Sequence, residues 1–215
     1  MTENLIEAQY DVTKKSKLKQ FYEKNKIFIF SFIFLFVLSL GSFSFYLENK
    51  EKKKVLLSEN YLQAKIYLEE GNKDKAIDVL KEVIFANDPT YSTLCLFLIM
   101  NQNLITDHKE LSTLFDHILE NNNFEKEVRN LLIYKKALFN SNFITESELL
   151  EDIKPLLNND TLWKPHALLL LGDYFVYKNE YLKAKEFYKQ ILSMNNLQRN
   201  LYDQAMHQLS LISND

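Results

Sequence analysis

The longest apolar run of the chain covers residues 27–47 and contains no charged residue. At 1.5 Å per residue, a helix of this length spans about 31 Å, close to the thickness of the hydrocarbon core of a bilayer. Phenylalanines alternate along the first half of the run, as they would in a strand. A lone strand in lipid leaves its backbone N–H and C=O groups unpaired, so the pattern predicts a transmembrane helix.

Features on both sides of this run favour a retained anchor over a cleaved signal peptide. The run is longer than the apolar core of most signal peptides, and it ends in bulky residues rather than small ones. Aromatic residues flank it, as in the interfacial belts of membrane proteins: Phe21, Tyr22, Phe45 and Tyr46. Residues 1–26 hold more lysines than the stretch just after the run, which predicts a cytoplasmic tail and an exported C-terminal part.

The remainder of the chain, residues 57–215, places apolar residues at helical spacing. Two segments align as units of equal length, residues 57–90 and 165–198. They share a small residue, then an aromatic residue, then an alanine at matching positions: Ala64 and Gly172, Tyr67 and Phe175, Ala76 and Ala184. This pattern resembles the tetratricopeptide repeat, in which two helices pack closely at small residues and successive units stack.

The stretch between these units predicts two further helical pairs with weaker signatures. In an alignment by unit length, Leu98 and Leu132 replace the small residue of the first helix. The predicted helices of this stretch and a closing helix are residues 91–103, 107–121, 125–140, 145–157 and 202–212. We therefore predict an all-α protein, with one transmembrane helix followed by a tetratricopeptide-like α-solenoid of about nine helices.

Residues 48–56 join the apolar run to the predicted solenoid and are rich in lysine and glutamate. This composition fits a helical extension of the membrane span, and it fits a solvated linker near lipid headgroups equally well.

Turn and capping residues support the predicted boundaries. Gly71 and Asn179 fall at the same position of the two clear units, where each helical pair must turn. Thr145 and Glu148 have the spacing of a capping box, and Pro165 suits the first turn of a helix.

Composition argues against several kinds of chemistry. The net charge of −3 implies no dominant basic surface for nucleic acid. Cys95 stands alone in an apolar segment, which favours a buried structural thiol over a nucleophile. His108 and His117 fall on opposite sides of one helix, and the chain lacks zinc-binding and nucleotide-binding motifs. We predict no enzyme activity, cofactor, metal or small-molecule substrate.

The whole arrangement is similar to one known family. A lysine-rich tail, a single anchor containing KLKQFYEKNKIFIFSFIF and a helical domain ending in LLLLGDYFVYKNEYLKAKEFYKQIL resemble the YfgM-like ancillary subunits of the bacterial SecYEG translocon. The resemblance implies an inner-membrane protein with a periplasmic C-terminal domain. Its implied partners are the Sec translocon, a membrane-anchored periplasmic chaperone and exported polypeptides. An alternative with the same fold is a scaffold for cell-envelope or division complexes.

Repeat geometry predicts which residues line the concave face of the solenoid, where such proteins bind partners. These positions are mixed in character, which suits an extended peptide or a partner helix, although several could instead pack against neighbouring helices. The candidate residues are Ser58, Tyr61, Lys65, Leu68, Glu69, His166, Leu169, Asp173, Val176 and Tyr177.

Overall fold

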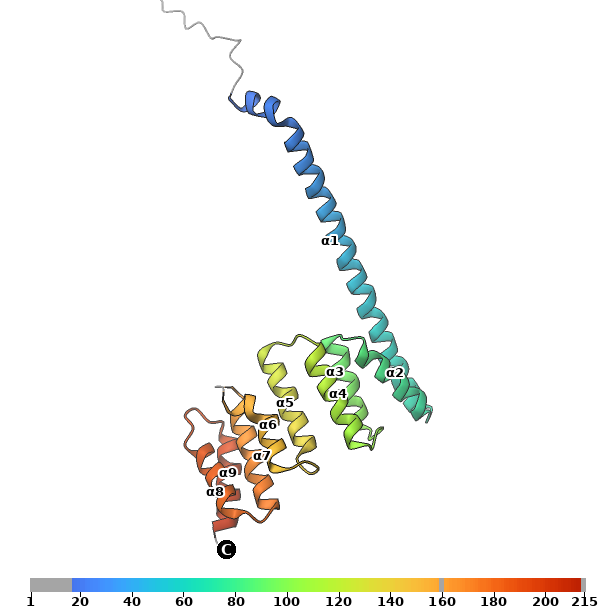
Figure 1. Ribbon diagram of the computed structural model, residues 1–215. Coiled ribbons are helices and arrows are strands. Elements are labelled where there is room, and N and C mark those ends of the chain that lie inside the picture. Colours follow the sequence, from blue (N-terminus) through green and yellow to red (C-terminus); the bar gives the residue numbers. More distant parts are fainter. Residues whose placement is uncertain (1–16, 159–160, 214–215) are drawn as a thin grey trace, which may run out of the picture. The chain divides into compact units, whose positions relative to one another are not determined.

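The computed structural model describes residues 17–158 and 161–213, and these residues form helices and connections without any strand (Figure 1). Contacts between residues divide the chain into two units, Met1–Val55 and Leu56–Asp215. The boundary falls within the first helix, α1 (Lys17–Glu69). The second unit, Leu56–Asp215, is called the helical-repeat unit below.

The part of α1 that belongs to the first unit exposes its apolar side chains. Within the described residues, α1 is the one helix long and apolar enough to cross a membrane, and none of its most apolar window is buried. Phe34 and Leu35, near the middle of the run, are both more than half exposed. α1 continues through residues 48–56 without interruption. An exposed apolar helix of this length is suited to lipid rather than to water.

The helical-repeat unit consists of the last turns of α1 followed by a series of short helices. Consecutive helices pack against one another, and the last helix contacts both of the two before it. The helices are α2 (Lys73–Phe85), α3 (Pro89–Asn101), α4 (His108–Asn121), α5 (Lys126–Asn140), α6 (Glu146–Leu157), α7 (Lys164–Tyr177), α8 (Tyr181–Leu192) and α9 (Arg199–Ser213). This order confirms the predicted all-α solenoid of helical pairs closed by a final helix.

Each pair has a first helix (the end of α1, α3, α5 or α7) and a second helix (α2, α4, α6 or α8). The second helices share one pattern of buried residues: a first buried residue, a second one four positions later, and a third one seven positions after the first. This spacing turns one stripe of each second helix toward the core. The buried sets are Ala76, Leu80 and Val83; Leu111, Phe115 and Ile118; Leu149, Ile153 and Leu156; and Ala184, Tyr188 and Ile191.

The shared stripe corrects the alignment of the two middle pairs. When the pairs are aligned on buried residues, the close-packing position of the first helix is Ala64, Ile99, Ala137 and Gly172 in turn. The prediction that Leu98 and Leu132 occupy this position is therefore wrong. The step from Leu111 to Leu149 is longer than the other two steps between pairs. The extra residues lie between Leu111 of α4 and Ala137 of α5, because that stretch is longer than the matching stretches of the other pairs. A fixed unit length cannot follow that insertion.

The closest approach of two helices lies at Gly172 of α7. A β-carbon added to Gly172 would overlap three ring atoms of Tyr188 on α8. Tyr188 is fully buried, so its ring has no free space to enter. In the first pair the equivalent residues are Ala64 and Leu80. Ala64 is larger than Gly172, and Leu80 is smaller than Tyr188. The glycine therefore makes room for an aromatic ring between α7 and α8.

The core of the helical-repeat unit forms two hydrophobic clusters that meet at α5. The first cluster extends from the end of α1 to α5, and the second from α5 to α9. Ile133 of α5 packs against both clusters. Since each helix contacts mainly its neighbours, stability accumulates from one pair to the next.

A partly buried polar network also joins α4, α5 and α6. The Asn140 side chain is almost wholly buried, and its amide nitrogen donates to Asp152 Oδ2 at 3.2 Å. Asn140 Oδ1 lies 3.0 Å from Nε2 of His108. Lys136 Nζ pairs with Asp116 at 2.8 Å and with Asp152 at 2.9 Å. These bonds fix the middle pairs where the repeat signature is weakest.

The predicted turns and caps have physical counterparts in the structure. Thr145 and Glu148 form the complete capping box at the start of α6, which confirms that prediction. Gly71 and Asn179 both adopt a positive φ, +80° and +61°, and each follows the first helix of a clear pair. Glycine and asparagine tolerate this left-handed conformation better than other residues do, which explains their use at the turn.

Candidate protein-interaction face

Three hollows lie between first helices of successive pairs, or where those helices begin. The first, of about 220 Å³, is bounded by the end of α1 and by α3. The second, of about 460 Å³, lies between α3 and the start of α5. The third, of about 450 Å³, lies where α5, α7 and α9 begin. The side of the helical-repeat unit formed by the end of α1, α3, α5 and α7 is called the first-helix face below.

The first hollow brings together three of the residues predicted for the concave face. Lys65, Leu68 and Glu69 line it, together with Leu98 of α3 and Gln102, the residue that follows α3. The charged Lys65 and Glu69 are exposed, and Leu68 is half-buried.

Other predicted residues of this helix are partly engaged in the fold. Tyr61 packs against the first hydrophobic cluster, and Ser58 is half-buried. Neither residue is among those that line the first hollow.

At the other end of the unit, three aromatic side chains meet where α5 and α7 lie side by side. The ring of Tyr134 on α5 stacks on Trp163 with centroids 5.5 Å apart. His166 of α7 lies 5.8 Å from Tyr134 and 5.1 Å from Trp163. The Nδ1 atom of His166 is buried and has no hydrogen-bond partner among the described residues. This trio forms a packed aromatic cluster that encloses an unpaired, buried nitrogen.

Asp173 lies about two helical turns beyond His166 along α7, close enough for its charge to affect Tyr134. Tyr188 passes beside Gly172 and donates its hydroxyl hydrogen to Asp173 Oδ1 at 2.7 Å. Burial raises the pKa of Asp173, and the Tyr188 hydrogen bond lowers it by a smaller amount. Burial, and then the charge of Asp173, raise the pKa of Tyr134. The carboxylate is therefore coupled to both tyrosines and still reaches solvent.

Of the remaining predicted residues of α7, two pack against the core and one is exposed to solvent. Leu169 and Val176 pack against the second hydrophobic cluster, so they serve the core at least in part. Tyr177 is 71% exposed at the end of α7. Lys178 Nζ lies 5.6 Å from the centre of the Tyr177 ring, in cation–π range.

Tyr134 and Trp163 were missed by the sequence-based prediction of the face. Once α5 is aligned on Ala137, Tyr134 takes the place that Tyr61 has before Ala64 and Leu169 has before Gly172. The signal was therefore present in the sequence, but the fixed unit length hid it. Trp163 precedes α7 and has no counterpart in the repeat pattern.

No three histidine, cysteine, aspartate or glutamate side chains within residues 17–158 and 161–213 gather closely enough to hold a metal ion. Burial raises the pKa of Cys95 to about 12, so this thiol is a poor nucleophile at neutral pH. His108 and His117 contact different asparagines, Asn140 and Asn87.

A family model of the tetratricopeptide repeat matches residues 60–86 and 165–196. These ranges fall within the two units identified from the sequence, and the match supports the predicted similarity of both units to the tetratricopeptide repeat. No curated protein and no solved structure matches the chain.

Proposed function

We propose that this chain is a membrane-anchored docking protein that receives segments of other polypeptides on its first-helix face. The proposal starts from the match of two of its units to the tetratricopeptide repeat. Tetratricopeptide repeats are protein-interaction modules, and stacked repeats of this kind present extended binding surfaces. The observation that carries the proposal is the aromatic trio of Tyr134, Trp163 and His166 beside the carboxylate of Asp173. Rigid aromatic groups next to a charge are typical of residues that dominate protein interfaces.

The membrane location in this proposal rests on α1. Its exposed apolar run and the excess of lysines before it favour an N-terminus in the cytoplasm and a helical-repeat unit outside it. In a bacterial inner membrane, that unit would face the periplasm. The resemblance to YfgM-like subunits supports the Sec translocon and a membrane-anchored periplasmic chaperone as partners, with emerging exported chains as cargo.

Replacing Asp173 with asparagine separates binding from stability. The Tyr188 hydroxyl can still donate to the asparagine oxygen, while the charge is lost. Because the folded state raises the pKa of Asp173, its carboxylate opposes folding above that pKa and ceases to do so at low pH. We expect Asp173→Asn to unfold at pH 7 at the same temperature as wild type or slightly above it, and the two proteins to converge near pH 3. Thermal melts at both pH values measure this.

The same variant tests the proposed function through its binding of peptides. Overlapping short peptides from an exported protein are titrated onto the full chain in lipid nanodiscs. We expect Asp173→Asn to weaken binding by about tenfold or more, the size of one charge-assisted hydrogen bond. Glu186→Gln makes the matching change on the exposed side of α8 and is expected to bind as wild type does. Equal binding by Asp173→Asn and wild type would contradict the proposal.

A further inference from the structure

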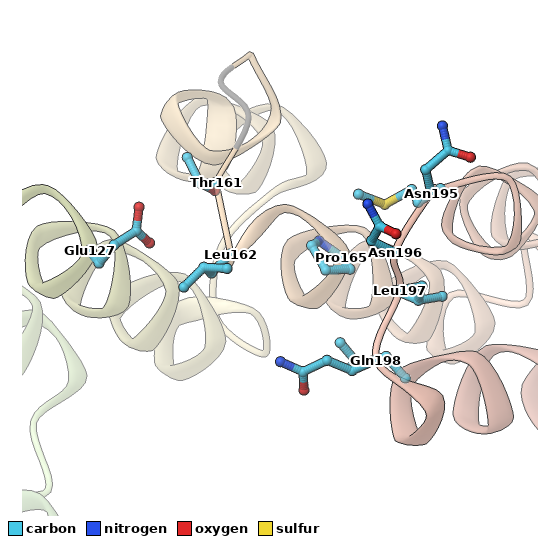
Figure 2. A pocket seen from close by; sticks show the side chains of 10 residues that line it. Glu127, Thr161, Leu162, Pro165, Asn195, Asn196, Leu197 and Gln198 are labelled. Carbon is cyan, nitrogen blue, oxygen red and sulfur yellow. The ribbon is translucent and has the colours of Figure 1, made fainter.

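The third hollow contains a feature that the docking function leaves unexplained. It lies beside the first turn of α5, the segment before α7 and the connection between α8 and α9 (Figure 2). In Figure 2 the Glu127 carboxylate extends from α5 toward the segment of Thr161 and Leu162, and the Gln198 amide extends from the side of α9. The hollow measures about 450 Å³, which is large enough for a long side chain.

Glu127 supplies the charge of this hollow. Its Oε2 atom is closed off from solvent, and no described residue donates a hydrogen bond to it. A carboxylate oxygen without water and without a donor is costly, and folded proteins nearly always give such an atom a partner. Because Oε2 is also closed to a water-sized group, a donor can reach it only when the Glu127 side chain turns toward the hollow that it lines.

The other residues that line the hollow indicate which group fits. Among the described residues that line it, Glu127 alone is charged. The side-chain amides of Asn195, Asn196 and Gln198 offer further oxygens that can accept hydrogen bonds. Leu162 and Leu197 supply apolar surface. A lysine side chain has the matching parts, because its ammonium group donates three hydrogen bonds and its stem is apolar.

We propose that this hollow binds a lysine side chain of the docked polypeptide, with its ammonium group paired to Glu127. The inference rests on the proposed function, since it names the residue type that a bound segment places at the start of α5 and α7. An anion would be repelled by Glu127, and a purely apolar side chain would leave the carboxylate oxygen unpaired.

The test uses Nα-acetyl-lysine-N-methylamide as the probe and its Nε-acetylated form as the uncharged control. Both are titrated onto the full chain in lipid nanodiscs, with the leucine methyl groups labelled for NMR. The lysine compound is expected to shift the methyl signals of Leu162, Leu197 and Leu201, which line the hollow, while Leu94 in the second hollow stays unchanged. The acetylated compound is expected to leave all four signals in place.

Glu127→Gln keeps the shape of the side chain and removes the charge. We expect the lysine compound to bind this variant about tenfold more weakly or worse. The spectrum of the unliganded variant reports whether it is folded. A second variant, Gln198→Lys, brings an ammonium group into the hollow from the chain itself and should block the probe without removing Glu127.

The proposal is overturned if both compounds shift the same methyl groups equally, or if Glu127→Gln binds the lysine compound as wild type does. Absence of any shift overturns it as well. Failure of the docking function is a separate result, since it is measured by peptide binding to Asp173→Asn. Peptides that depend on Asp173 but are indifferent to Glu127→Gln would leave the docking function standing and remove the lysine site.

Discussion

Gly172→Ala is expected to destabilise the helical-repeat unit, although alanine is the better helix former. The added methyl group would overlap the fully buried ring of Tyr188, and that ring is also held by its hydrogen bond to Asp173. Overpacking of this kind costs about 1–3 kcal/mol, against a gain of at most about 1 kcal/mol from helix propensity. Thermal and urea unfolding followed by circular dichroism measure the difference.

The first pair supplies the control for this prediction. There, Ala64 and Leu80 occupy the positions of Gly172 and Tyr188. In a Tyr188→Leu background, Gly172→Ala reproduces that pair and is expected to cost nothing or to stabilise. Such non-additivity between contacting residues is typically about 0.5–3 kcal/mol. A melting temperature that rises when Gly172→Ala is made alone would show that Tyr188 does not limit the approach of α7 and α8.

Two arginines in the apolar run of α1 are expected to remove the protein from the membrane. Phe34→Arg and Leu35→Arg lie near the middle of the run, where each charge opposes insertion by about 2.5–3.5 kcal/mol. The wild-type chain should stay in the membrane pellet after alkaline carbonate washing, and the double variant should move to the supernatant.

The matched control places the same two arginines further along α1, at Glu59 and Gln63. Both residues are exposed and lie in the helical-repeat unit, beyond the apolar run. Glu59→Arg with Gln63→Arg should therefore leave the protein in the pellet. Equal retention of the Phe34→Arg, Leu35→Arg variant would mean that α1 does not anchor the chain.

The helical pairs could be predicted from the sequence because their signals are local. Spacing of apolar residues and turn residues such as Gly71 marked nearly every helix, and the Thr145 capping box marked the start of α6. Each of these features depends on interactions within a few residues of the chain.

The candidate face was harder to predict because it depends on the register of the middle pairs. A short insertion around α5 shifts that register, so a fixed unit length placed Leu132 where Ala137 packs and overlooked Tyr134. The position of Trp163 and the closed-off oxygen of Glu127 follow from contacts between elements distant in sequence. No single-sequence pattern carries that information.

The measurement that tests the central proposal most directly is photocrosslinking in intact cells. A benzophenone side chain is placed at Tyr177, which is exposed on the first helix α7, or at Lys189, which is exposed on the second helix α8. Docking on the first-helix face predicts crosslinks from Tyr177 to polypeptides being exported, lost in the Asp173→Asn variant, and few from Lys189. Crosslinks of equal yield from both positions, or none from Tyr177 while export is active, would contradict it.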